Sequence, residues 1–153
     1  MRKIFYKTIF LLSLTMAISS CGTSDLEYKD AKLTAVTILS IPLDAASITL
    51  LNTSASETFE WSPATASDSL PPFYEVVFAK TNGDLSKPFY RVTSAKTGIT
   101  PSVKIGHKIL NVIADSAGIA PGATGTIKWA VMTSRGIGGV VGTSRTLTLK
   151  RFL

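Results

Sequence analysis

Short runs of β-branched and aromatic residues, separated by turn-forming residues, occupy most of the chain from Leu33 onward. In the run Glu57–Pro63, Phe59 and Trp61 alternate with polar residues, which is the two-residue period of a half-buried strand. About seven such runs follow one another at spacings that suit two packed sheets. The sequence therefore predicts an all-β, antiparallel sandwich.

Turn signals between the runs indicate how the strands are connected. Pro42 cannot donate to a strand ladder, so it should mark an edge or a change of sheet. Asn82-Gly83 is a hairpin signal, and it predicts that the strands on either side pair antiparallel. The last two strands should form a closing hairpin across the Gly-rich link Arg135–Gly142. We expect strands at Leu33–Leu39, Ser47–Asn52, Glu57–Pro63, Phe73–Asp84, Lys87–Ser94, Thr126–Ser134 and Thr143–Phe152.

One segment departs from the β pattern and predicts a single short helix over Lys108–Ala117. Gly118 and Pro121 follow it as stop signals. His107, at the start of the helix, is expected to face solvent. The apolar residues that share one face at helical spacing are Ile105, Ile109, Leu110, Ile113, Ala114 and Ala117.

The first 20 residues have the layout of a removable signal segment. Arg2, Lys3 and Lys7 give a positive start, and the apolar run Ile9–Ile18 follows. This run is shorter than the roughly 20 residues that a membrane-spanning helix needs. We therefore assign residues 1–20 to a signal peptide.

Cys21 is the only cysteine of the chain, and it follows the apolar run and two small residues, Ser19 and Ser20. The sequence Ile18–Cys21 resembles a bacterial lipobox, in which the cysteine becomes the acylated first residue of the mature protein. The alternative is an ordinary signal peptide whose cysteine lies there by chance. With a lipobox, Cys21 is the lipid attachment site, and acyl chains such as palmitate hold the protein at a membrane.

Composition excludes several function classes. The chain has 16 basic and 10 acidic residues; three of the bases lie in the signal segment, so 13 remain against 10, a net charge of +3. The bases are scattered, unlike the clustered footprint of a nucleic-acid-binding protein. One cysteine and one histidine cannot form a disulfide or a usual zinc site, so we expect no metal and no cofactor. Glu75 and Asp115 have no partner carboxylate that the sequence can identify, so we expect no enzyme.

The mature chain divides into two parts. Residues 21–32 are polar and acidic without periodicity, which predicts a flexible tether. Residues 33–153 have room for one core and are expected to form a single domain.

Aromatic side chains are the main candidates for a ligand role. Trp61 and Trp129 share the register of apolar neighbours that face inward, so we expect both in the core. Phe73 and Tyr90 belong to two paired strands on which some side chains must face outward. These two residues are the candidate ligand-binding residues.

Five patterned segments carry a family resemblance: Phe59–Ser62, Phe78–Lys80 before Asn-Gly-Asp, Ile109–Ala114, Ile127–Val131 and Ser144–Leu149. Their succession resembles the N-terminal immunoglobulin-like domain of the SusE family, over roughly Ala35–Phe152. Members of this family are lipid-anchored outer-membrane proteins of glycan-utilisation systems in Bacteroidetes.

The resemblance implies an immunoglobulin/fibronectin-III-like sandwich, anchored at the outer membrane and exposed at the cell surface. It implies a non-catalytic accessory or assembly module, with a TonB-dependent transporter complex as partner. Family members that bind sugar carry further domains after this one, whereas this sequence stops at Leu153, so no particular glycan is implied. The alternative is a small surface glycan-binding protein that uses exposed aromatic side chains.

Overall fold

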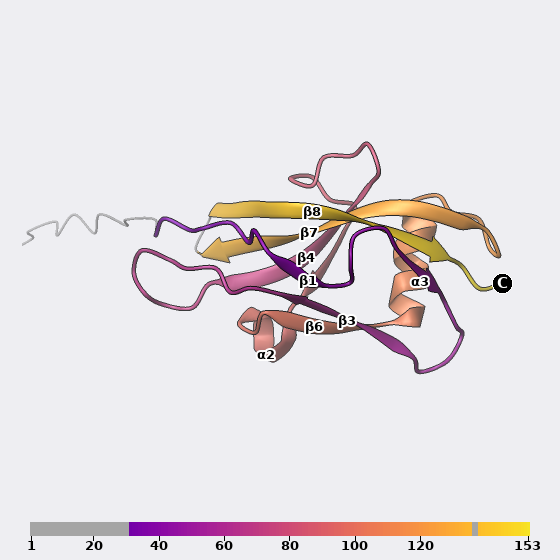
Figure 1. Cartoon of the computed structure of the whole chain (residues 1–153), viewed down its shortest axis with the longest axis horizontal. Coiled ribbons are helices and arrows are strands. Elements are labelled where there is room, and N and C mark those ends of the chain that lie inside the picture. Colours follow the sequence, from indigo (N-terminus) through magenta and orange to yellow (C-terminus); the bar gives the residue numbers. More distant parts are fainter. Residues whose placement is uncertain (1–30, 136–137) are drawn as a thin grey trace, which may run out of the picture.

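The computed structural model describes residues 31–135 and 138–153, which form two packed sheets (Figure 1). Eight strands and two short helices confirm the predicted all-β sandwich. The predicted signal peptide, Cys21 and all but the last two residues of the predicted tether lie outside the described residues.

The strands divide between the sheets in the immunoglobulin-like manner. One sheet has the order β1 (Leu39–Ile41), β3 (Ser56–Trp61) and β6 (Ser102–Gly106). The other has the order β2 (Ala46–Thr49), β8 (Gly138–Lys150), β7 (Thr124–Arg135), β4 (Phe73–Lys80) and β5 (Tyr90–Thr93). β2 pairs with β8 in parallel, so the expectation of a wholly antiparallel sandwich is wrong for this pair.

The chain changes sheets between β1 and β2, around Pro42, as the sequence predicts. Side chains of β8 hold this crossing in place. Arg145 Nη1 donates to the carbonyl oxygens of Ser40 at 3.2 Å and Pro42 at 2.5 Å. Asp44 Oδ1 accepts from the amide and the hydroxyl of Thr146 at 2.8 and 3.0 Å. These side-chain bonds replace a strand ladder where the backbone passes from one sheet to the other.

The first predicted strand, Leu33–Leu39, is wrong over most of its length, because β1 begins only at its last residue. Between residues 33 and 38, the only strand-type pairing described is an isolated bridge from Leu33 to Ala66. Leu33 and Thr34 contact the β3–β4 loop, whereas the carbonyl oxygen of Val36 accepts a hydrogen bond from the amide of Thr143 in β8.

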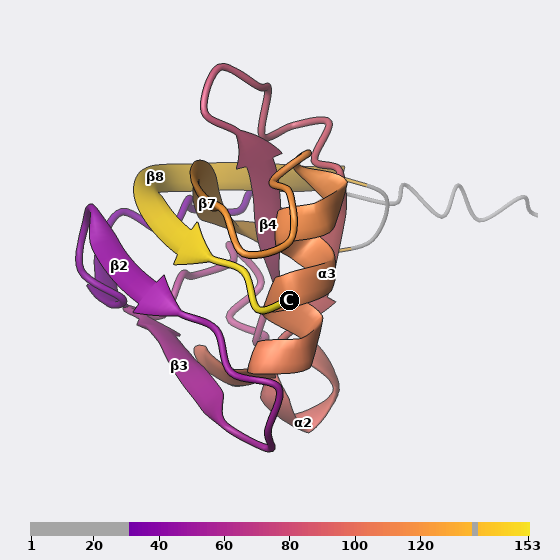
Figure 2. The ribbon, with the colours of Figure 1, turned by 90° about the vertical axis from the view of Figure 1, so that its right-hand side faces the viewer.

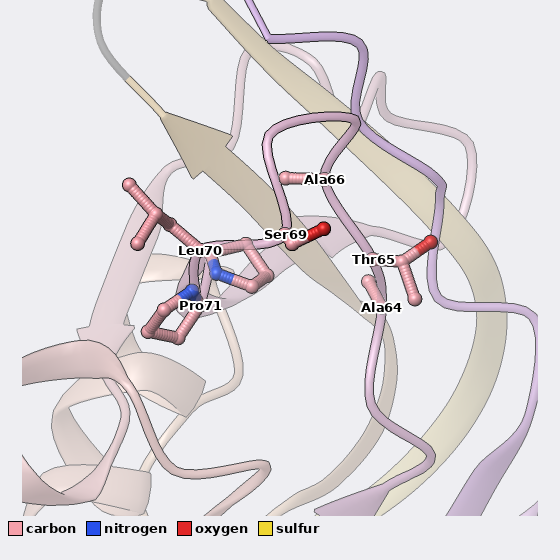
Figure 3. Close-up of a pocket in the computed structure, with 7 residues that line it drawn as sticks. Ala64, Thr65, Ala66, Ser69, Leu70 and Pro71 are labelled. Carbon is pink, nitrogen blue, oxygen red and sulfur yellow. The ribbon is translucent and has the colours of Figure 1, made fainter.

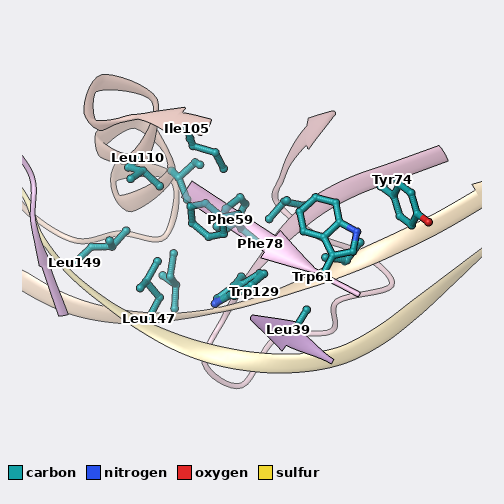
Figure 4. Close-up of a cluster of buried hydrophobic side chains, with 14 of the residues drawn as sticks. Leu39, Phe59, Trp61, Tyr74, Phe78, Ile105, Leu110, Trp129, Leu147 and Leu149 are labelled. Carbon is teal, nitrogen blue, oxygen red and sulfur yellow. The ribbon is translucent and has the colours of Figure 1, made fainter. Parts of the chain in front are cut away.

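An aromatic cluster joins the two sheets (Figure 4). Phe59 of β3 makes edge-to-face contacts with Trp129 and Phe78, at ring-centroid distances of 5.0 and 5.9 Å. Trp61 meets Tyr74 in the same manner at 5.7 Å. Both tryptophans are buried, which confirms their predicted place in the core.

The predicted antiparallel pairing of β4 with β5 across the Asn82-Gly83 turn is confirmed, but β4 ends at Lys80 rather than Asp84 and β5 begins at Tyr90 rather than Lys87. Residues 81–89 join the two strands. At the start of this loop, the amide of Gly83 donates to the carbonyl oxygen of Lys80 and closes a turn. Leu85 of this loop is buried on the outer face of the five-stranded sheet, against Val77 and its neighbours. Burial of Leu85 removes apolar surface from water and stabilises the loop against the sheet.

Two helices complete the fold. α2 (Ala95–Gly98) is a short turn in which Lys96 and Thr97 have positive φ. α3 (His107–Ser116) confirms the predicted helix within one residue at each end, and it packs between the sheets near the end that carries the C-terminus (Figure 2). The predicted buried face is partly wrong: Ile109 is 43% exposed, and Ile105 belongs to β6. The closing hairpin of β7 and β8 is confirmed.

Candidate functional site

The two candidate ligand-binding residues do not share a surface. Phe73 begins β4 and is 48% exposed. Tyr90 lies opposite the buried Phe78 in the β4–β5 pair and packs against the core. Phe73 is five residues from Phe78 on the same strand, so it faces the other side of the sheet, roughly 17 Å away along the strand. The fold therefore does not combine the two rings into one stacking platform, and a ligand role for either stays a prediction.

His107 is a buried structural residue, and the expectation that it faces solvent is wrong. Its Nδ1 accepts a hydrogen bond from the amide of Leu51 at 3.0 Å. Its Nε2 lies 3.0 Å from Glu57 Oε1, and its amide donates to the carbonyl of Ala55. The imidazole thus joins α3 to β3 and to the β2–β3 loop. The polar sequence around Leu51–Ala55 gives no local signal of this long-range contact.

The described carboxylates with side-chain partners form hydrogen bonds or ion pairs that connect parts of the fold. Hydrogen bonds from the amide and hydroxyl of Thr146 hold the pKa of Asp44 below its ordinary value of 3.8. Bonds from the hydroxyl and amide of Ser86 lower the pKa of Asp84 in the same way. Ion pairs or hydrogen bonds join Glu57 to His107, Asp68 to Arg135, Glu75 to Arg91, and Asp115 to Arg151. The lowered pKa values of Asp44 and Asp84 favour the ionised form, which accepts these hydrogen bonds.

A pocket of about 440 Å³ lies in the β3–β4 loop (Figure 3). The hydroxyl of buried Tyr74 positions the first part of this loop, because it accepts from the amide of Ala64 at 3.0 Å. The lining residues are small or apolar: Ala64, Thr65, Ala66, Ser69, Leu70, Pro71 and Pro72. This lining offers two hydroxyls and backbone groups but no titratable side chain. In the described ranges, no group of three potential ligand side chains could hold a metal ion.

Three aliphatic side chains that are close together in sequence are exposed in the segment that contains β1. Ile38, Ile41 and Leu43 are 60%, 47% and 71% exposed, and we call these three residues the β1-edge surface. Arg145 already donates hydrogen bonds to the carbonyl oxygens of Ser40 and Pro42. A strand added at this edge would have to displace the Arg145 side chain. This surface is therefore suited to side-chain docking rather than to strand addition.

A second apolar surface lies on α3, where Ile109 and Val112 are 43% and 50% exposed. The opposite side of this helix is buried through Leu110 and Ile113. Among the residues that the structure describes, no helix is both long enough and apolar enough to cross a membrane.

Comparison with known proteins identifies a family that this chain matches. The family model described as SusE outer membrane protein matches residues 24–132. Neither the curated proteins nor the solved structures include a significant match to this chain. The match covers β1 to β6, both helices and most of β7, and therefore includes the β1-edge surface, the pocket and His107.

Proposed function

Because the chain belongs to the SusE outer membrane protein family, we propose that it is a lipid-anchored, non-catalytic accessory module of an outer-membrane glycan-uptake system. The family supports an outer-membrane location and a link to glycan utilisation. The accessory role, the lipid anchor and exposure at the cell surface are the parts that we add.

The proposed anchor is Cys21, at the end of the apolar N-terminal run. Each buried methylene of an acyl chain contributes about 0.8 kcal/mol to membrane binding, so several chains on one cysteine give stable attachment. The tether of residues 21–32 would then link the lipid to the sandwich.

The proposed module acts by docking a protein, and the β1-edge surface carries this proposal. Three aliphatic side chains within six residues are each about half exposed or more: Ile38, Ile41 and Leu43. Clustered apolar exposure of this kind is typical of a protein interaction site. The partner we propose is a TonB-dependent transporter complex, which the family resemblance implies.

The test compares two double variants of the full-length chain in its native membrane. Ile41→Ser with Leu43→Ser changes the β1-edge surface, and Ile109→Ser with Val112→Ser is a control of similar exposure on α3. We expect the first to lower cross-linking to the transporter at least about tenfold, which corresponds to ~1.4 kcal/mol. The control should retain cross-linking. Equal cross-linking by both variants and the parent would exclude docking at this surface.

A second candidate function is glycan binding at the cell surface. It is favoured by one observation, the 48% exposure of the Phe73 side chain, because an exposed aromatic ring can stack on a sugar. Tyr90 packs against the core, on the other face of its sheet.

A further inference from the structure

The end of the β3–β4 loop and the start of β4 form an apolar segment, Leu70-Pro71-Pro72-Phe73, in which all residues except Pro72 are exposed. Leu70 is 54% exposed and Phe73 is 48% exposed. The ring of Phe73 lies over Gly98 of α2, where an added Cβ would approach it to 3.3 Å. One side of the ring is thus supported by the protein, while the rest is available to another surface.

The first described residues, which begin the domain, lie beside this loop. The amide of Lys32 donates to Ser67 Oγ at 3.0 Å, and the amide of Ser67 donates to the carbonyl of Lys32 at 3.0 Å. The bridge between Leu33 and Ala66 extends the contact. The start of the domain and the apolar loop therefore belong to one end of the sandwich.

The length of the preceding chain limits how far this end can lie from a membrane. Nine residues separate Cys21 from Ala31. At about 3.5 Å per residue, they can span at most roughly 35 Å. β8 extends away from this end for 13 residues, or roughly 40 Å, toward α3 and the C-terminus (Figure 1). Of the two ends of the sandwich, the loop end is the one that an acylated Cys21 would keep near lipid.

We propose that Leu70 and Phe73 contact the lipid bilayer and orient the domain on it. This inference rests on the proposed acylation of Cys21. The nearby carboxylates of Asp68 and Glu75 are ion-paired with Arg135 and Arg91, at 2.9 and 3.1 Å, which reduces their repulsion of lipid head groups. The contact is apolar, so it should persist when salt is raised.

The test labels the loop in the full-length lipoprotein. Because Cys21 is the only cysteine and acylation would block its thiol, Leu70→Cys introduces a single reactive thiol. Val112→Cys on α3 is the matched control, since Val112 is 50% exposed and Leu70 is 54% exposed. Each thiol receives an environment-sensitive fluorophore, and the protein is reconstituted into phosphatidylcholine vesicles with brominated acyl chains.

We expect bromine to quench the fluorophore at position 70 several-fold more than the one at position 112. Vesicle-bound protein with equal quenching at the two positions would overturn the lipid contact. A blue shift at position 70 without bromine quenching would also overturn it, because it would indicate an apolar protein neighbour. If instead the parent chain reacts with the fluorophore at Cys21 and does not bind vesicles, the proposed lipid anchor itself fails. Unchanged thermal unfolding of both labelled variants verifies their fold.

Discussion

The main-chain amide of Leu51 donates a 3.0 Å hydrogen bond to Nδ1 of His107, a side chain buried 56 residues later in the sequence. A nitrogen that accepts this bond cannot carry the proton, so the neutral imidazole is protonated at Nε2 and donates to Glu57. This pair fixes the β2–β3 loop against the start of α3.

Replacing His107 by alanine should destabilise the protein. The change removes two hydrogen bonds of a buried side chain and leaves the Leu51 amide without its acceptor, at a cost of about 1–3 kcal/mol in unfolding free energy. Denaturant unfolding of the full-length chain measures it. Leu51→Ala keeps the amide and changes a side chain that is 49% exposed, so it is the control and should cost much less. Equal losses in both variants would contradict the assigned role of the imidazole.

Trp61→Ala should cost about 3–5 kcal/mol, because it truncates a buried aromatic side chain that packs on Tyr74. Such a loss is a large part of the roughly 5–15 kcal/mol that stabilises a typical domain. Thermal unfolding provides the measurement, and Phe73→Ala at a half-exposed position is the comparison. An unchanged melting temperature together with a loss of sugar binding would make Trp61 a ligand platform.

Asp44→Ala should destabilise the protein at neutral pH and have less effect in acid. The bonds from Thr146 lower the pKa of Asp44 in the folded state, so the ionised form is the one that folding favours. The stability that ionised Asp44 contributes is fully present above its ordinary pKa of 3.8. This stability is lost as the pH falls through the lower pKa of the folded state. Unfolding free energies at about pH 6 and about pH 2.5 should show the parent and variant converging in acid. A constant difference between them would contradict this linkage.

Cys21→Ser should move the protein from the membrane fraction to a soluble or unprocessed form, because serine cannot receive the thioether-linked lipid. Fractionation and incorporation of radioactive palmitate measure the change. Persistence of the label and of membrane association in the variant would exclude Cys21 as the attachment site.

The protein should bind no oligosaccharide tightly by itself. Sugar sites need exposed aromatic faces together with directed polar groups, whereas both tryptophans are buried and Phe73 and Tyr90 occupy opposite faces of one sheet. Calorimetry of the full-length protein against starch, levan and mucin-derived glycans tests this expectation. Micromolar binding, lost in Phe73→Ala, would favour the glycan-binding function over protein docking.

Local sequence patterns determined the elements whose side chains alternate or repeat regularly. The strand with Phe59 and Trp61, the β4–β5 pairing, the β7–β8 hairpin and α3 were all predictable, because period and turn chemistry act over a few residues. The change of sheet at Pro42 was predictable for the same reason, since the ring removes a ladder donor.

Tertiary structure alone decided the contacts between distant segments. The sequence does not predict the short β6, although Val103 and Ile105 alternate with polar residues, because five residues are a weak signal. Neither the burial of His107 nor the β1-edge surface could be predicted. The burial of His107 depends on its contact with the Leu51 amide, which is distant in sequence. The β1-edge surface depends on the packing of Arg145 of β8 against the segment around Pro42. The position of the apolar loop beside the start of the domain was decided in the same way, by the contact between Lys32 and Ser67.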